Sequence, residues 1–422
     1  MRRRWFITAA LLDTFGGGLA YRAWLGLLTV GAAAGGAAYA VQLRDGLRVT
    51  NMTDAVSWGI YIANFNFGVG IAAAAVMVVI PAYAYRVTSF RRIVFVGESL
   101  ALAAVVMCLL FVTVDLGRPD RAWHLIPFLG ALNFPASVLS WDVVVLGGYL
   151  AINAVLVSIA LRAKYYGRRP SPRVYVPLIF VGMLWAISIH TVTAFLYTWL
   201  GARPFWNSAI VVPRFLASAF VSGPAFLVIA LRVLRSRAAF PVADHVFLTF
   251  RRIIAVTLLT NIFLFAAEIF TELYGGSLHA ASLRYLLFGH HDHDAIRAYV
   301  WGAVALEVAA ALVLLTPLRD RPRLFDAACV ASFLGVWVEK GMGLVVPGFI
   351  PTPLGEVVEY VPSFEELSVS TGIFSVGLLL FTVLVRLGVR IETGALGPAT
   401  PNPARDPDPA TPLPDPAPGG PR

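Results

Sequence analysis

Cysteine is nearly absent from this sequence. Its 422 residues include only Cys108 and Cys329, and both lie within apolar runs. Two separate thiols cannot supply the four ligands of an iron–sulfur cluster, and no CxxCH motif is present to attach haem c. We therefore expect no haem or iron–sulfur cluster in this chain. We interpret both cysteines as packing residues that face lipid or the core.

Charge is also scarce. Charged residues make up 14% of the chain, whereas a soluble domain carries about 25%. Hydrophobic residues make up 58%, the mean hydropathy is +0.76, and apolar runs of about 20 residues recur. These features predict an integral membrane protein embedded in the lipid bilayer. The net charge of +9 fits basic cytoplasmic loops better than nucleic-acid binding, so we expect no nucleic-acid partner.

The apolar runs predict an all-α integral membrane protein with about ten transmembrane helices. The helices are expected at about 24–41, 56–83, 93–114, 137–161, 174–199, 213–234, 253–273, 296–315, 324–346 and 367–389. The transmembrane domain spans 21–392 and follows a cytoplasmic N-terminal segment, 1–20. The sequence AYA at 38–40 mimics a signal-peptide cleavage site, but the first apolar segment is too long for one and should be retained. The Pro-rich tail, 393–422, should be disordered and cytoplasmic.

Basic residues gather in alternate loops. Arginine and lysine are concentrated between the second and third, fourth and fifth, sixth and seventh, and eighth and ninth expected helices. The opposite loops are balanced or acidic. The positive-inside rule then places the basic loops and both termini in the cytoplasm of a bacterial or archaeal cell, with the protein in its cytoplasmic (inner) membrane.

The stretch FVTVDLGRPDRAW, at 111–123, brings four charged residues to the mouth of the third expected helix. They are Asp115, Arg118, Asp120 and Arg121. Gly117 and Pro119 should end the helix there. Charge is costly inside lipid and cheap at its edge. On spacing alone, an ordinary polar loop explains the stretch as well as a functional site does.

Polar residues also occur at the outward ends of the neighbouring helices. A possible converging set is Tyr61, Asn64, Asp115, Asp142 and Arg203. His190 lies about 15 Å below that face, at 1.5 Å per helical residue. An aromatic belt and helix–helix hydrogen bonds are the alternative explanation. This alternative suits Trp58 but suits Asn64 poorly, because lipid offers an asparagine no partner.

Four stretches, taken in order, resemble the NrfD family of quinone-binding membrane subunits. They are WGIYIANFNFGVG, DLGRPDRAW, HTVTAFLYTWLGARPFWN and VVPRFLASAFVSG. Near the end, WVEKGMGLVVPGFIPTPLGEVVEYVPS resembles the DsrP/HmeB branch, which includes the Hdr-like menaquinol oxidoreductase membrane subunits linked to sulfur metabolism. The resemblance implies two four-helix bundles plus two extra helices. It also implies a quinone pocket against a periplasmic ferredoxin-like subunit with four iron–sulfur clusters, in complexes that can hold further cytochrome and membrane subunits.

The resemblance also implies site residues. The cofactor-binding candidates are Tyr61, Asn64, Asn66, Arg118, Arg203 and Trp206. Arg203 and Trp206 come from the ARPFW motif, and Asp115 from DLGRP. A quinone, menaquinone or ubiquinone, needs an apolar slot for its tail and hydrogen-bonding groups for its oxygens. We expect Asp115 and His190 to accept the protons of the quinol. Tyr61 and Asn64 should orient the head group.

Acidic residues inside the expected helices form a second set of candidates. They are Glu98, Asp142, Glu268, Glu307 and Glu339. A proton path is one interpretation, because ionisable groups inside a membrane are commonly functional. Carboxylates that bond to neighbouring helices are an equally good one.

The loop GHHDHD could bind a metal through three histidines and two aspartates. These are His290, His291, Asp292, His293 and Asp294. They lie on one loop with no second fixed ligand, so we favour a solvated outer loop at a subunit interface and predict no metal.

Three other classes of function fit the sequence less well. A di-haem cytochrome b needs paired histidines on facing helices, but only His190 lies well inside a helix. A secondary transporter would show helices broken at the membrane midplane, whereas the Gly and Pro breaks here lie mainly near the faces. A purely structural membrane anchor would leave the intramembrane polar residues unexplained.

Overall fold

The computed structural model describes residues 6–126, 129–168, 170–276, 279–290 and 292–396. Within these ranges the chain is helical and contains no strand. Ten of its helical segments are long and apolar enough to cross a membrane. The predicted all-α membrane fold is therefore confirmed. Most of the predicted tail, 393–422, lies outside the described residues, as does the start of the N-terminal segment.

The ten spans follow one another along the chain. They are α2 (Leu19–Asp45), the broken span Ile60–Ala84, α5 (Thr88–Asp115), α6 (Val138–Tyr165), α7 (Pro172–Thr198), α8 (Val211–Arg237), α9 (Asp244–Gly275), α11 (Arg297–Leu315), the broken span Pro322–Phe349, and α14 (Phe364–Glu392). The first broken span consists of α3 (Ile60–Ala72), α4 (Ala74–Val79) and the π-helix η2 (Ile80–Ala84), and the second of α12 (Pro322–Lys340), α13 (Met342–Val345) and η5 (Val346–Phe349).

Shorter elements lie outside the spans. They are α1 (Phe6–Thr14), η1 (Leu47–Val49), η3 (Pro119–Leu125), α10 (His279–Phe288) and η4 (Pro317–Asp320). The sequence patterns did not predict α1 or α10. The predicted start of α9, at 253, was also wrong: Arg251 belongs to the helix and pairs with Asp320 at 2.8 Å. A long arginine side chain can bury its stem and still reach the membrane edge, so its charge did not mark a loop.

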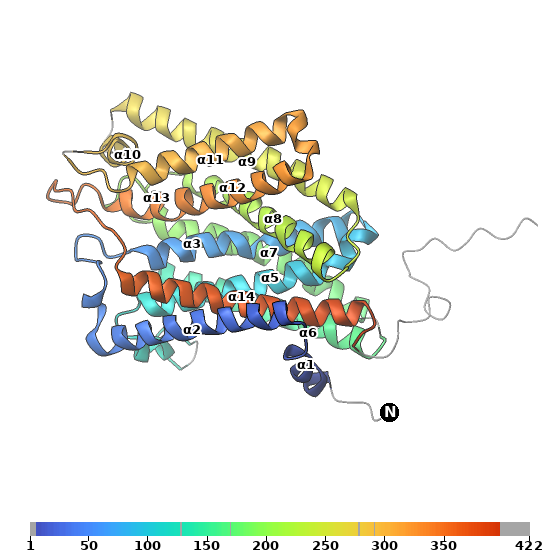
Figure 1. Cartoon of the computed structure of the whole chain (residues 1–422). Coiled ribbons are helices and arrows are strands. Elements are labelled where there is room, and N and C mark those ends of the chain that lie inside the picture. Colours follow the sequence, from blue (N-terminus) through green and yellow to red (C-terminus); the bar gives the residue numbers. More distant parts are fainter. Residues whose placement is uncertain (1–5, 127–128, 169, 277–278, 291, 397–422) are drawn as a thin grey trace, which may run out of the picture.

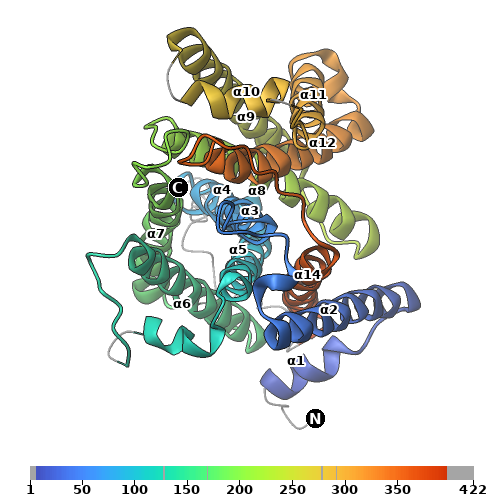
Figure 2. The same cartoon turned by 90° about the vertical axis from the view of Figure 1, so that its left-hand side faces the viewer.

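The spans form two four-helix bundles and one extra pair (Figure 1). The first bundle consists of α3–α4, α5, α6 and α7, and the second of α8, α9, α11 and α12. The bundles meet where α3 packs against α8. The extra helices, α2 and α14, lie side by side against the first bundle, where α14 packs on α5 (Figure 2). The predicted arrangement of two bundles plus two helices is confirmed.

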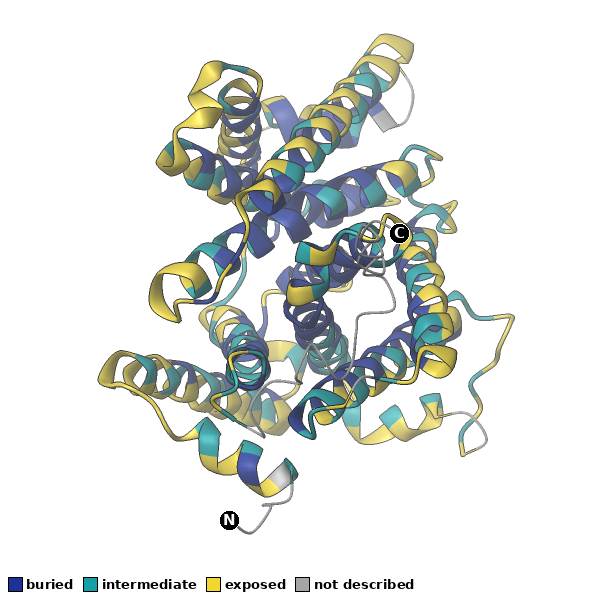
Figure 3. Ribbon diagram, turned by 90° about the vertical axis from the view of Figure 1, so that its right-hand side faces the viewer, coloured by how far each residue is buried: buried dark blue, intermediate teal, exposed yellow. Residues whose placement is uncertain are grey.

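The burial of α3 and α2 differs sharply. The most apolar window of the α3–α4 span is 78% buried, whereas that of α2 is 11% buried. Figure 3 shows the same contrast between enclosed helices and helices whose outer faces are exposed. A helix that is enclosed on all sides has no lipid-facing surface. Its polar side chains can therefore find partners on neighbouring helices, as membrane helices require.

Small residues bring α2 and α14 into backbone contact. A methyl group added at Gly35 would lie 2.4 Å from the Cα atom of Gly372, and one at Gly31 would lie 2.4 Å from the Ser375 hydroxyl. Such close approach is typical of small residues at membrane helix interfaces. At its other side α14 packs on α5, where Phe374 meets Phe111 edge-on at 5.3 Å. α14 is therefore the main packing partner of α2 and connects it to the first bundle.

We call the end of the molecule that carries Asp45, Asp115 and Phe364 the motif face, which lies on the left in Figure 1. The starts of α3 and α6 and the end of α7 belong to the same end, because consecutive spans run in opposite directions. This places the DLGRPD segment near the first turns of α3.

Candidate functional site

A cavity of about 470 Å³ lies at the motif face, between the end of α2 and the DLGRPD segment. It is lined by Tyr39, Gln42, Leu43, Gly46, Leu47, Leu116, Gly117, Arg118, Pro119 and Asp120. The volume falls within the range of about 300–1,000 Å³ that is usual for small-molecule sites. Leucines and a few polar groups share the lining, so an apolar ring with polar substituents would suit it.

The DLGRPD segment leaves α5 in an extended conformation at Leu116 and turns at Pro119 into η3. Arg118 Nε and Nη2 donate to the two carboxylate oxygens of Asp120 at 3.0 and 2.9 Å. This pair lies exposed at the cavity. The hydrogen bond from Arg118 lowers the pKa of Asp120, so this carboxylate is ionised at neutral pH. The pair marks the polar rim of the cavity.

Gln42 connects the cavity wall to Tyr61. Its Nε2 donates to the carbonyl oxygen of Val114 at 2.6 Å, and its Oε1 accepts from the Tyr61 hydroxyl at 2.7 Å. Both side chains are buried. Tyr61, a predicted head-group residue, is thus one hydrogen bond away from the lining. Gln42 was missed because the first helix was predicted to end at 41. The sequence did contain a signal for it, because Gln42 is an isolated amide near the end of an apolar helix.

Asp115 ends α5 directly before the lining residue Leu116. Its Oδ1 atom is buried and has no hydrogen-bond partner among the described residues. Asp115 and Glu366 both interact electrostatically with Tyr61. The DLGRP aspartate directly follows Val114, whose carbonyl accepts from Gln42, and it has one oxygen unused.

Tyr360 and Glu366 fix the start of α14 against the start of α3. The Tyr360 hydroxyl accepts from the Ile60 amide at 2.9 Å and donates to Glu366 Oε1 at 2.5 Å. Glu366 Oε2 accepts from the amides of Asn51 and Ser363 at 3.0 and 2.9 Å. Burial, with Glu366 adding to it, raises the pKa of Tyr360, so the phenol stays protonated and keeps donating. Glu366 is therefore a structural carboxylate.

Asn64 and Asn66 point away from the cavity. Trp337 of α12 donates to Asn64 Oδ1 at 2.9 Å, and Asn66 Nδ2 donates to the Tyr197 hydroxyl on α7 at 2.6 Å. Of the polar residues on α3, only Tyr61 bonds to the cavity wall. The expected convergence with Asn64 does not occur, because α3 is enclosed and its polar side chains bond to different neighbours.

His190 and Asp142 lie inside the first bundle. The Thr193 hydroxyl donates to Asp142 Oδ1 at 2.9 Å. His190 Nδ1 donates to the Ala186 carbonyl at 2.7 Å, and its buried Nε2 has no hydrogen-bond partner among the described residues. His190 also interacts electrostatically with Lys340 of α12. Neither His190 nor Asp142 lines the cavity.

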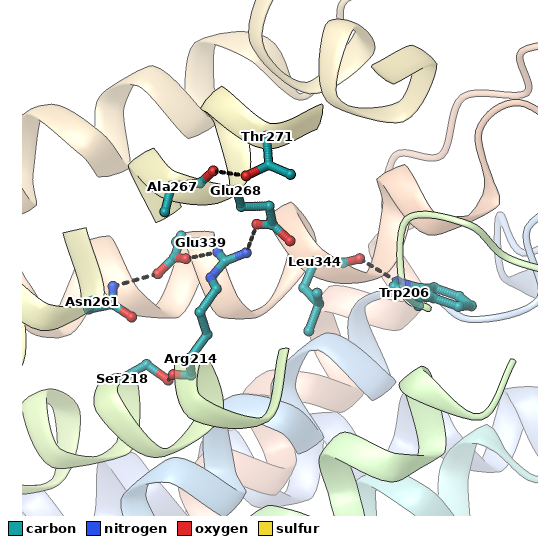
Figure 4. Close-up of polar contacts among 9 residues, drawn as sticks. All are labelled: Trp206, Arg214, Ser218, Asn261, Ala267, Glu268, Thr271, Glu339 and Leu344. Atoms are coloured by element: carbon teal, nitrogen blue, oxygen red, sulfur yellow. Dashed lines mark hydrogen bonds and ion pairs between the residues drawn. The ribbon is translucent and has the colours of Figure 1, made fainter. Parts of the chain in front are cut away.

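Trp206 and Arg203 belong to an aromatic cluster instead of the cavity. Trp206 stacks on Trp58 with a centroid separation of 5.4 Å and meets Phe349 edge-on at 4.9 Å. Its indole donates to the Leu344 carbonyl at 2.8 Å (Figure 4). The Arg203 guanidinium lies 4.8 Å from the centre of the Phe349 ring. The ARPFW residues thus pack against the end of the Pro322–Phe349 span and help to join the two bundles.

A buried polar network occupies the second bundle. Arg214 of α8 forms ion pairs with Glu268 of α9 and Glu339 of α12 (Figure 4). Asn261 Nδ2 donates to Glu339 at 2.9 Å and to Glu307 of α11 at 3.2 Å. We call these five residues the Arg214 network. It contains three of the five acids that were predicted as a proton path.

The other two predicted acids, Asp142 and Glu98, lie apart from this network. The Tyr175 hydroxyl on α7 donates to Glu98 Oε1 at 3.4 Å, and a small void of about 20 Å³ adjoins the carboxylate. The five acids therefore do not form one continuous chain of contacts. Each accepts from a residue on another helix, as the interpretation of helix-bonded carboxylates requires.

The histidine loop is tied to its surroundings by ordinary pairs. His290 and His293 exchange backbone hydrogen bonds, and His293 Nδ1 lies 3.3 Å from Glu359. Asp294 pairs with Arg297 at 2.7 Å. His291 lies outside the described residues. Over the part of the chain that the structure describes, no three His, Cys, Asp or Glu side chains form a group that could hold a metal ion.

The family model "Polysulphide reductase, NrfD" matches residues 48–350, well over half of the chain. The chain belongs to the NrfD family. The family prediction made from the motifs is therefore confirmed. The NrfD match begins after α2 and ends before α14, so this pair of helices lies outside the matched part.

Three relatives can be compared with this NrfD chain. It is 25% identical over 398 residues to a putative dimethyl sulfoxide reductase membrane subunit of Halobacterium salinarum, covering 85% of this chain and 89% of that protein. It is 22% identical over 390 residues to a selenate reductase subunit of Mesobacillus selenatarsenatis, covering 82% and 89%. It is 22% identical over 187 residues, 44% of each chain, to an Hdr-like menaquinol oxidoreductase integral membrane subunit of Archaeoglobus fulgidus.

Proposed function

We propose that this chain is the quinol-binding membrane subunit of an oxidoreductase complex and that the cavity at the motif face holds the head group. The observation that carries the proposal is a space of about 470 Å³ beside the DLGRPD segment, lined in part by three leucines. Asp115 does not line this space, but it directly precedes the lining residue Leu116, and its Oδ1 atom has no partner among the described residues. A quinone ring needs apolar contact, and its oxygens need hydrogen-bonding groups.

Oxidation of a quinol releases two protons and two electrons. Asp115 would accept the first proton, since a positioned carboxylate can act as a general base. The second would leave through the exposed rim at Arg118 and Asp120. Neither Asp115 nor His190 lines the cavity. The proposal gives the proton to Asp115 because it directly precedes the lining residue Leu116, whereas His190 lies inside the first bundle. The electrons would pass to a metal centre on a neighbouring subunit.

The partner is proposed from the relatives, which are named as subunits of dimethyl sulfoxide reductase, selenate reductase and menaquinol oxidoreductase. We propose a ferredoxin-like iron–sulfur subunit with four clusters, seated on the motif face. Arg162, Lys164, Arg235 and Arg237 lie in the last turns of α6 and α8, at the opposite end. The positive-inside rule then turns the motif face toward the periplasm and both termini toward the cytoplasm.

Replacing Asp115 tests this function. In the purified complex, Asp115→Asn should lower menaquinol-dependent reduction of the iron–sulfur partner by about 100-fold, because the proton acceptor is lost. The complex should still assemble, since Asp115 Oδ1 holds no partner among the described residues. Asp54→Asn is the matched control, an exposed acid that does not line the cavity, and should retain activity within about threefold.

Full activity of Asp115→Asn would overturn the proposal. Binding of a quinone analogue to the complex separates it from the alternatives, because a secondary transporter or a structural anchor would bind none. Ubiquinol and menaquinol should be assayed side by side, since the lining does not choose between the two rings.

Coupling to proton translocation is a second proposal, and the Arg214 network motivates it. Glu307 is 4% exposed, and its Oε1 atom has no hydrogen-bond partner among the described residues. A carboxylate with spare capacity inside a membrane can take up a proton. In liposomes that contain the complex, Glu307→Gln should reduce proton uptake per electron by at least about half while quinol oxidation continues. Equal uptake in the variant and the parent would remove this path.

A further inference from the structure

The helix α2 supplies one wall of the cavity although it lies outside the NrfD match. Five of the ten lining residues precede residue 48, where the match begins. These are Tyr39, Gln42, Leu43, Gly46 and Leu47. The other five come from the DLGRPD segment. The cavity is therefore incomplete without a helix that the family match does not include.

Gln42 is held in a defined orientation on this wall. Leu28, Gly35 and Gln42 are the buried residues of α2, and Gln42 is the polar one among them. The Val114 carbonyl can only accept a hydrogen bond, which fixes the amide nitrogen toward α5. The amide oxygen faces the Tyr61 hydroxyl. The surrounding helices thus hold Gln42 at both ends of its amide.

The amide of Gln42 retains capacity after these two bonds. A primary amide carries two N–H donors and an oxygen with two lone pairs, and each end of Gln42 uses one in the bonds described. The remaining N–H belongs to a side chain that lines the cavity. A quinone carbonyl oxygen is a strong acceptor, so it matches this unused donor.

We propose that Gln42 is a positioning residue, which donates its second N–H to one oxygen of the quinone head group and so makes α2 part of the binding site. This inference rests on the proposed function and names the protein partner of that oxygen. Gln42 transfers no proton, because an amide does not ionise near neutral pH; proton transfer stays with Asp115. Gln42 therefore acts on binding more than on turnover.

The test compares Gln42→Leu with the parent in the purified complex. We expect the KM for menadiol, and the Kd for the fluorescent analogue 2-heptyl-4-hydroxyquinoline N-oxide, to rise about tenfold, the cost of one lost hydrogen bond. The kcat should stay within about threefold. Thr29→Val is the matched control: Thr29 lies exposed on α2 and bonds only to the Leu25 carbonyl in its own helix, so its KM should not change.

Gln42→Leu leaves the Tyr61 hydroxyl without its partner, and this could prevent folding. The double variant Gln42→Met with Tyr61→Phe removes both ends of that hydrogen bond, so no tyrosine hydroxyl is left unpaired. The Val114 carbonyl loses its Gln42 donor in the single and the double variant alike. It should show the same rise in KM. If Gln42→Leu folds poorly, the double variant decides the outcome by the same measurements.

Parental KM and analogue affinity in a folded Gln42 variant would overturn the inference. With Asp115→Asn inactive at the same time, the proposed function would stand and only the role of Gln42 would fall. If the parent complex bound no analogue, the proposed function itself would fail. A Gln42 variant that altered only the phospholipid retained by the complex would also overturn the inference and assign the cavity to a lipid chain.

Discussion

The cavity and the Arg214 network both contain intramembrane polar residues, but they differ in how much free space lies beside these residues. Around the cavity, Asp115 and Gln42 keep unused hydrogen-bonding capacity beside a space of about 470 Å³. In the second bundle, Arg214 is paired with two glutamates, and the void beside it is about 10 Å³, enough for about one water molecule. Three atoms of this network, Arg214 Nε, Asn261 Oδ1 and Glu307 Oε1, also have no hydrogen-bond partner among the described residues. The ion pairs of the network hold helices together in an interior too small for a ligand, whereas the cavity has room for one.

The largest test of this comparison removes the arginine. Arg214→Met should destabilise the second bundle by about 3–5 kcal/mol, because Glu268 and Glu339 lose their counter-charge in a buried site. Thermal unfolding of the purified complex in detergent would measure the loss. Arg232→Met is the matched control on α8, where the arginine pairs with Asp326 at 3.0 Å and is partly exposed; it should cost less than about 1 kcal/mol.

A stable Arg214→Met protein with lost quinol oxidation would break the comparison, because the network would then serve the reaction and not the fold. If the network serves the fold, as we expect, the Arg214→Met protein that remains folded should keep the parental KM for quinol.

A smaller test concerns the bond between the bundles. Trp337→Phe should destabilise the protein by about 1 kcal/mol, because Asn64 Oδ1 loses the hydrogen bond that the Trp337 indole donates to it. The melting temperature in detergent would show the shift, and the KM for quinol should not change. A tenfold rise in KM would instead return Asn64 to the head-group site predicted from the sequence.

The fold followed from the sequence because the apolar runs are long and clearly separated. The DLGRPD segment that the motif singled out lines a cavity through Arg118, whereas Asp115 only precedes the lining residue Leu116. Helix ends were harder to predict. A first helix drawn to 41 left out Gln42, and a last helix drawn from 367 left out Glu366, which instead belongs to the capping box of α14.

The directions of buried side chains could not be predicted from periodicity. The spacing of Tyr61 and Asn64 fits one helical face, yet the first bonds to α2 and the second to α12. A period gives the face of a helix, and only the packing of its neighbours gives the partner. Trp206 shows the same limit, since its motif was read as a ligand contact and its indole bonds to the Leu344 carbonyl.

The contact between Gly35 and Gly372 has a consequence for the shape of the cavity. Gly35 precedes Gln42 by two helical turns, about 10 Å along α2. Any side chain at position 35 would meet the backbone of α14 and wedge the two helices apart. Since α2 forms one side of the cavity at the motif face, a larger residue at position 35 would shift that side from two turns away, without itself lining the cavity.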